Sequence, residues 1–115
     1  MVVRHDFGDV LENTTIKTVI ESEGKIISAL PSCGCTTAIA DNKSLLIEVK
    51  TGSVPTHLGR TSKQFKKHII IDVQYGTDKS KTQRERIQLL AKVYTKHAFD
   101  KLGQQQEERL NPKEV

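Results

Sequence analysis

The stretch HIIIDVQY at residues 68–75 decides the fold class of this chain. Its apolar residues recur at every second position, which is the period of a β-strand that buries one face. Residues 84–95 repeat this alternation after a short polar loop at 76–83. The positions predicted to face inward are Ile69, Ile71, Val73 and Tyr75 in the first stretch and Ile87, Leu89, Ala91 and Val93 in the second. The two stretches therefore predict neighbouring strands of one sheet, joined by a hairpin loop.

Shorter alternating segments precede this pair, and turn residues separate them. We expect strands at residues 5–12, 15–21, 25–30, 35–40 and 45–50, the last of which places Leu45, Ile47 and Val49 on one face. Residues 51–67 show no periodicity and predict the longest loop of the chain. About seven short strands with almost no helix before residue 96 are typical of an all-β sandwich, with a closed barrel as the alternative.

The length of 115 residues suits a single domain. We expect the sandwich to occupy residues 1–95, followed by a C-terminal extension, partly helical or extended, at residues 96–115. Phe99 and Leu102 are three positions apart in this extension and would share one face of a helix, with Leu110 further along. These apolar side chains predict docking against a partner groove or a neighbouring copy.

The net charge of +4 is unevenly distributed. Residues 56–101 carry eleven Lys and Arg against four Asp and Glu. Most of these bases are predicted to lie in two loops, and the candidate partner-binding residues are Arg60, Lys63, Lys66 and Lys67 in the first loop and Lys79, Lys81, Arg84 and Arg86 in the second. Phe65 is the only aromatic residue in either loop, whereas single-stranded nucleic acids need stacking platforms. An acidic protein surface is therefore favoured over nucleic acid as the partner.

Both cysteines lie in the segment PSCGCTT at residues 31–37. Cys33 and Cys35 supply only two metal ligands, the four histidines are scattered, and the spacing fits no common zinc pattern. Residues two apart in an extended strand have Cα atoms about 6.6 Å apart, near the upper limit for a disulfide, so a bridge would need a kink at Gly34. We therefore expect two reduced thiols at a strand junction, with no metal and no cofactor.

The sequence lacks the motifs of common enzymes. It has no nucleophile elbow, no zinc-protease helix motif and no phosphate-binding loop, and no set of acid, base and nucleophile converges. A non-enzymatic protein is predicted. The N-terminus has no apolar run like a signal peptide, and no stretch approaches the length of a membrane span. These features predict a soluble protein without a signal peptide or a membrane partner.

Several of these segments together resemble a known family. FGDV at residues 7–10, LPSCGCT at 30–36, LLIEV at 45–49, FKKHIIIDV at 65–73 and IQLLAKV at 87–93 follow its order. The chain resembles the bacterial and phage immunoglobulin-like family of unknown function marked by Ser32, Cys33, Gly34, Cys35 and Thr36, a relative of ASH and Hydin-type domains. The resemblance covers roughly residues 5–95. It departs at residues 41–44, which replace the usual Pro-Gly turn, and in the segment before the motif, which is shorter.

The resemblance implies an immunoglobulin-like β-sandwich of about seven strands. It also implies a non-enzymatic structural or interaction module that docks onto other protein subunits of a larger assembly. We expect that assembly to be a phage virion, in its head, neck or tail, or a comparable cytoplasmic complex. The alternative is a thiol-dependent redox or metal-handling module centred on Cys33 and Cys35.

Overall fold

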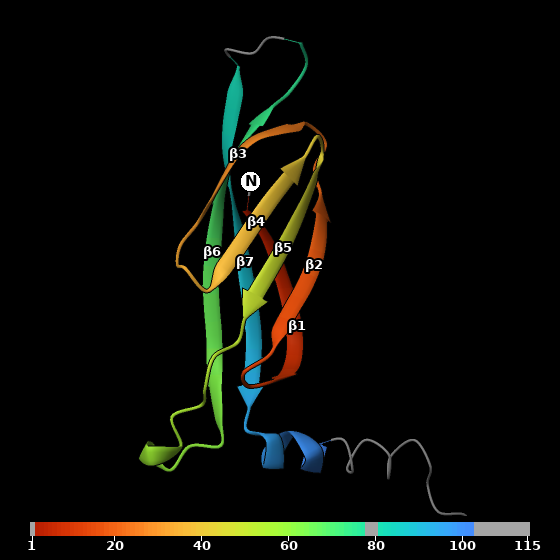
Figure 1. Cartoon of the computed structure of the whole chain (residues 1–115). Helices are drawn as coiled ribbons and strands as arrows, with labels where there is room; N and C mark the ends of the chain where they lie inside the picture. The colour runs from red at the N-terminus through yellow and green to blue at the C-terminus, as the bar shows by residue number, and fades with distance from the viewer. Residues whose placement is uncertain (1, 78–80, 103–115) are drawn as a thin grey trace, which may run out of the picture.

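The computed structural model describes residues 2–77 and 81–102 (Figure 1). Its strands are β1 (Val2–Leu11), β2 (Thr15–Glu21), β3 (Lys25–Pro31), β4 (Thr36–Asp41), β5 (Ser44–Lys50), β6 (Ser62–Gln74) and β7 (Thr82–Tyr94). A 3₁₀-helix at Thr56–Leu58 precedes β6, and a short α-helix follows β7 at residues 96–102. Among these residues, no helix is long and apolar enough to cross a membrane.

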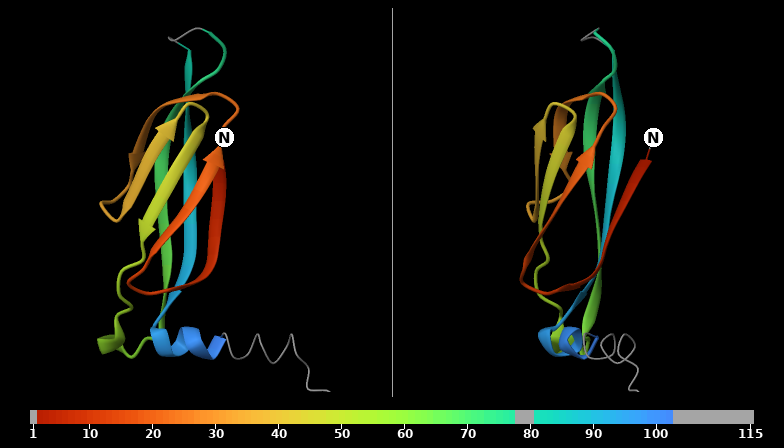
Figure 2. Two further views of the ribbon diagram at one scale, coloured as in Figure 1. Left: turned by 45° about the vertical axis from the view of Figure 1, so that its right-hand side comes forward. Right: turned by 90° about the vertical axis from the view of Figure 1, so that its right-hand side faces the viewer.

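The strands form two sheets that face each other (Figure 2). One sheet has the strand order β1-β7-β6-β3 and the other has the order β2-β5-β4. β1 runs parallel to β7, and the other described pairings are antiparallel. This connectivity is that of an immunoglobulin-like sandwich whose first strand pairs with its last. The predicted all-β sandwich is confirmed, and the barrel alternative is wrong because the two sheets stay separate.

The core lies between the sheets and is almost entirely aliphatic. Alternate residues of β5, β6 and β7 are buried, as their sequence pattern predicts. The large side chains with less than 2% exposure include Leu45, Ile47 and Val49 of β5, Ile69 and Val73 of β6, and Ile87, Leu89 and Val93 of β7. Burying each such side chain contributes about 1.5–3 kcal/mol, which is the main force that holds the two sheets together.

β6 and β7 form a long hairpin, with 13 residues in each strand. Ile69 lies directly opposite Ile87, but Ile71 lies opposite Glu85. The apolar residues of β7 beyond Leu89 therefore pair with the first part of β6 and not with its isoleucines. The predicted neighbouring strands are confirmed, in a register that is displaced toward the start of β6.

β6 begins at Ser62, so the predicted loop at residues 51–67 was too long. Phe65 is buried and pairs with Ala91, and the ladder continues to Ser62 opposite Tyr94. In this part of β6 the inward positions are filled by one aromatic ring and by lysines, whose stems are apolar although their ends are charged. A search for alternating apolar residues does not detect such a strand.

β1 also extends further than the predicted strand at residues 5–12, because it starts at Val2. Its register with β7 shifts between Asp6 and Asp9, where Gly8 adopts a positive φ of 76°. Asp6 Oδ1 accepts a hydrogen bond of 2.8 Å from the Gly8 N–H. The glycine thus allows a bulge that bends the strand while it stays paired with β7.

Candidate protein-docking surface

The first half of β6 has a neighbour on one side only. β3 pairs with β6 as far as Pro31 opposite Ile69, and the Ser32 N–H then donates to the His68 carbonyl at 2.9 Å. Figure 1 shows β3 beside only the upper part of β6, after which the chain turns into β4. Residues 62–67 therefore form an unpaired strand edge within the described part of the chain, which we name the free β6 edge.

The hydrogen-bond pattern shows which backbone groups face outward at this edge. The Thr95 N–H donates to the Thr61 carbonyl at 3.0 Å, so odd-numbered residues of β6 exchange hydrogen bonds with β7. Even-numbered residues point their N–H and C=O groups the other way, as His68 does toward Ser32. Gln64 and Lys66 accordingly direct their backbone groups away from the sheet.

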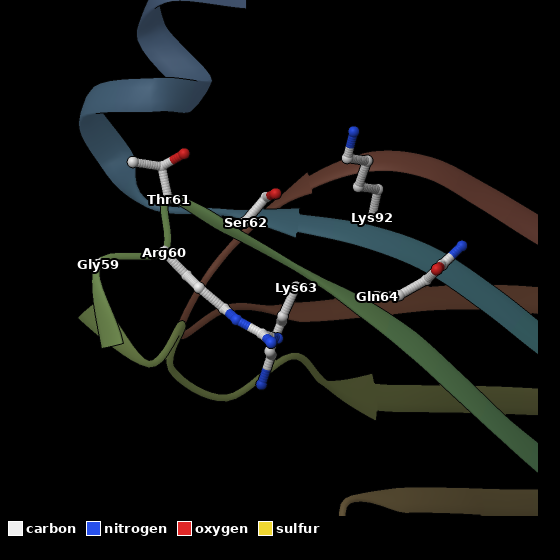
Figure 3. A pocket seen from close by; sticks show the side chains of 7 residues that line it. All are labelled: Gly59, Arg60, Thr61, Ser62, Lys63, Gln64 and Lys92. Carbon is white, nitrogen blue, oxygen red and sulfur yellow. The ribbon is translucent and has the colours of Figure 1, made fainter. Parts of the chain in front are cut away.

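Three hollows are lined in part by residues of the free β6 edge. One of about 410 Å³ on the inner side is lined by residues that include Cys35, Lys50, Lys63 and Lys67. Another of about 380 Å³ on the outer face of the sheet is lined by Arg4, Gln64, Lys66, Gln88 and Leu90. A third, of about 590 Å³, lies at the start of β6. Figure 3 shows this third hollow, where Lys92 points to the opposite side of the sheet from Arg60 and Lys63.

Basic side chains dominate these hollows. The seven cationic residues that line them, which we name the basic surface, are Arg4, Lys50, Arg60, Lys63, Lys66, Lys67 and Lys92. Two acidic residues, Asp6 and Asp9, line an adjoining hollow that shares Lys92 and Gln64 with the basic surface and its hollows. Among the described residues, the ion pairs are Lys17–Glu48 and Arg84–Asp72, which do not involve the basic surface. Its charges are therefore available to an acidic partner.

The structure brings together only some of the predicted partner-binding residues. Arg60, Lys63, Lys66 and Lys67 gather at the free β6 edge, but the three lysines lie on a strand and not in a loop. The prediction of a second basic loop was wrong for Arg84 and Arg86, which lie on β7, and Arg84 bonds to Asp72 at 3.2 Å. Lys81 directly precedes β7, and Lys79 lies outside the described residues.

Three members of the basic surface escaped the sequence analysis. Arg4, Lys50 and Lys92 lie on β1, β5 and β7, far from one another in the sequence. Only the pairing of β1 with β7, and the packing of β5 near β6, bring them to one place. For Lys92 the sequence does contain a signal, because it lies between the inward residues Ala91 and Val93 and must therefore point outward from β7.

The two cysteines form a disulfide, so the prediction of reduced thiols was wrong. Residues 32–35 form a bend and a turn between β3 and β4, which shortens the Cα separation to 5.4 Å, below that of an extended strand. The Thr36 N–H donates to the Cys33 carbonyl at 3.3 Å across this turn. Thr36 itself is buried, and its hydroxyl lies 4.0 Å from Cys33 Sγ and 3.6 Å from Cys35 Sγ.

The motif touches the basic surface directly. Ser32 Oγ accepts a hydrogen bond of 3.2 Å from the His68 N–H, where the free β6 edge ends. The Cys35 carbonyl accepts a hydrogen bond of 2.8 Å from the Lys50 N–H, and Cys35 lines the inner hollow with that lysine. Gly34 is exposed at the tip of the turn. The disulfide turn thus forms one wall of the candidate site.

The titrating groups with shifted pKa values lie elsewhere, near the other end of the hairpin. The Ser28 hydroxyl, and then Arg84, hold the pKa of Asp72 below its ordinary value by hydrogen bonding. The Tyr75 hydroxyl donates to the Glu85 carboxylate at 2.6 Å, and this bond, together with burial, raises the pKa of the phenol. These contacts tie β3, β6 and β7 together. No group of three or more His, Cys, Asp or Glu that could hold a metal occurs among the described residues.

The C-terminal extension begins as a helix at residues 96–102. The Thr95 hydroxyl caps it by accepting from the Ala98 N–H at 3.3 Å, and the Phe99 N–H donates to the Thr95 carbonyl at 2.8 Å. Phe99 and Leu102 are half-buried. Leu110, the third apolar residue predicted to dock, lies outside the described residues.

Comparison of the chain with protein-family models, with curated proteins and with solved structures finds no match.

Proposed function

We propose that this protein is a non-enzymatic structural and interaction module that docks onto other protein subunits through its basic surface. The observation that carries the proposal is the gathering of cationic side chains at an unpaired strand edge, where Lys63, Lys66 and Lys67 lie on β6 and Lys50 lines the same inner hollow. A phage virion, in its head, neck or tail, is the proposed setting, and it rests on the family resemblance of the cysteine motif. A comparable cytoplasmic complex would use the same surface.

Electrostatics favours an acidic protein as the partner. Clustered lysines and arginines that outnumber their acidic neighbours raise the local positive potential, which speeds the encounter with an acidic surface. Phe65 is the aromatic residue of the free β6 edge, and its side chain is only 6% exposed. It therefore offers no face on which a base of a single-stranded nucleic acid could stack.

The test is incorporation of a charge-reversed variant into large complexes. Lys63, Lys66 and Lys67 are each changed to Glu in a tagged protein expressed in its native host, and sedimentation measures the share that travels with assemblies. We expect this share to fall at least tenfold. The matched control changes the exposed Lys17, Lys25 and Lys43 to Glu, with the same net charge change away from the basic surface.

Equal incorporation of the two variants would refute docking through the basic surface. Circular dichroism and thermal melting of both variants show beforehand that each is folded. Loss of incorporation in both to the same degree would also refute the proposal, because total charge and not a local surface would then control assembly.

The Cys33–Cys35 disulfide supports a thiol-dependent redox module as a second candidate function. Lys50, Lys63 and Lys67 line the hollow beside Cys35, and cationic neighbours stabilise the thiolate that reduction of a disulfide releases. In the exchange, a partner dithiol loses two electrons and two protons and closes its own disulfide, while Cys33 and Cys35 become thiols. Mass spectrometry of the oxidised protein with a reduced dithiol peptide tests this. Stoichiometric peptide oxidation, absent from a Cys33→Ser, Cys35→Ser variant, supports the redox role, and no exchange after hours rejects it.

A further inference from the structure

We infer that the free β6 edge takes up an extended acidic segment of the partner protein, which joins the four-stranded sheet as an additional strand next to β6. This inference rests on the proposed docking function and adds the chemistry and the conformation of the occupant. Addition of a strand to an exposed sheet edge is a recurrent way in which domains bind extended peptides, with backbone hydrogen bonds providing much of the affinity.

The backbone of β6 is ready to pair. Gln64 and Lys66 point their N–H and C=O groups away from β7, and among the described residues no hydrogen bond to these groups is formed. The nearby linker after β5 bonds elsewhere, since the Thr51 N–H donates to the Thr14 carbonyl at 2.9 Å and the Val54 N–H donates to Glu12 Oε1 at 2.9 Å. The described part of the chain therefore leaves this edge open.

The disulfide turn explains why β3 does not cover the edge. β3 ends at Pro31, which has no N–H to donate, and the chain then turns between Ser32 and Cys35. The Cys33–Cys35 bridge closes this turn and directs the chain into β4 of the opposite sheet. An added strand would occupy the line along which β3 would have continued. Six residues of β6 are available, which corresponds to about 20 Å of extended chain.

Bases flank both sides of the position that the added strand would take. Lys63 and Lys67 face the inner hollow together with Lys50, whereas Lys66 is exposed on the outer face of β6 itself. Because side chains of a strand alternate between the two faces of a sheet, acidic residues of the occupant would meet lysines on either face. An apolar occupant fits poorly, since Phe65 is buried and Leu90 is half-buried beneath these charges. The charge pattern therefore selects an acidic segment.

A pair of synthetic peptides tests this inference on the purified full chain. The first is a fluorescein-labelled seven-residue peptide that alternates glutamate with threonine, and the second carries N-methyl groups on alternate backbone amides with the same charge. Fluorescence anisotropy measures the affinity of each. We expect the N-methylated peptide that cannot donate to Gln64 and Lys66 to bind at least tenfold more weakly, because methylation removes strand pairing and leaves the charges.

A change in the protein provides the reciprocal test. Gln64→Pro removes an outward N–H without removing a hydrogen bond to β7, and we expect it to weaken binding of the first peptide at least tenfold. Gln64→Ala, the control, keeps that N–H and should bind within twofold of the wild type. If the proline variant does not fold, the peptide pair alone decides the question.

Equal affinity for the two peptides would overturn strand addition and leave docking by charge intact. Absence of binding by the first peptide would also overturn it, and the sedimentation test would then decide on the docking function separately. A single-stranded oligonucleotide of equal charge serves as the competitor. If it binds more tightly than the peptide, the surface recognises phosphates and the acidic protein segment is rejected.

Discussion

At the scale of single residues, the contact between the half-buried Tyr75 and the buried Glu85 can be tested directly. Glu85 is 6% exposed and faces inward opposite Ile71, where its carboxylate accepts from the Tyr75 hydroxyl at 2.6 Å. Tyr75→Phe leaves that carboxylate without this donor. Loss of the partner of a buried acceptor costs about 1–3 kcal/mol, which urea melts will measure, while Tyr94→Phe should change little.

The pH dependence of this effect follows from the raised pKa of Tyr75. Because the folded state holds the phenolic proton more tightly than the unfolded state, the stabilisation is complete below the ordinary tyrosine range. It is lost as the pH rises through the folded-state pKa. The difference between wild type and Tyr75→Phe should therefore be constant near neutral pH and shrink in strong alkali. A difference that instead grew with alkaline pH would contradict the hydrogen-bond assignment.

Gly24 can be tested in the same way, because the backbone of β6 approaches it too closely to leave room for a side chain. A Cβ at this position would lie 2.5 Å from the Gln74 carbonyl oxygen and 2.7 Å from Val73 Cγ1. Gly24→Ala should therefore push β3 away from β6 and destabilise the domain by about 1–3 kcal/mol. Gly34→Ala is the control, because a Cβ there meets nothing within 4 Å. Similar melting temperatures for the two variants would show that residue 24 does not lie this close to Val73 and Gln74 of β6.

At the scale of elements, the β6–β7 hairpin carries much of the core. Ile71 is 3% exposed, so Ile71→Ala should cost about 2–5 kcal/mol in denaturant melts. Its neighbour Ile70 points to the outer face and is half-buried, and Ile70→Ala should cost clearly less. A loss below about half a kcal/mol for Ile71→Ala would show that this residue is not in the core.

The C-terminal helix is an element that the sandwich does not need for closure. The sheets are complete at Tyr94, and the half-buried Phe99 and Leu102 lie beyond them. We predict that removal of residues 96–115 leaves the melting temperature nearly unchanged and abolishes incorporation into the assembly. If the truncated protein assembles normally, the extension has no role in docking. If it fails to fold, the extension belongs to the core of the domain.

The sequence predicts elements better than it predicts their neighbours. Alternation located β5, most of β6 and β7 because their inward positions are aliphatic, whereas the first part of β6 escaped because Lys63 and Lys67 occupy such positions. The disulfide escaped because the distance estimate assumed extended chain where residues 32–35 turn. The basic surface needs cross-strand pairing that no local pattern encodes, which is why Arg4 and Lys50 were missed.

At the scale of the whole molecule, the sandwich places the cysteine motif, the free β6 edge and the basic surface side by side. The disulfide turn ends β3 early, and this leaves an open edge in the region where lysines from β5 and β6 converge. Surface charges separated by more than about 8 Å are screened at physiological salt, so docking should weaken as salt rises. The fold thus places the cysteine motif directly beside the proposed docking surface.

The most direct test of this account is amide hydrogen exchange of the protein within its native assembly, compared with the free chain. Mass spectrometry of fragments that cover residues 62–67 would report on the outward amides of Gln64 and Lys66. We predict that these amides exchange rapidly in the free protein and are protected in the assembly, because an added strand accepts their hydrogen bonds. Equal exchange at residues 62–67 in the two states, with protection appearing elsewhere on the sandwich, would contradict docking at the free β6 edge.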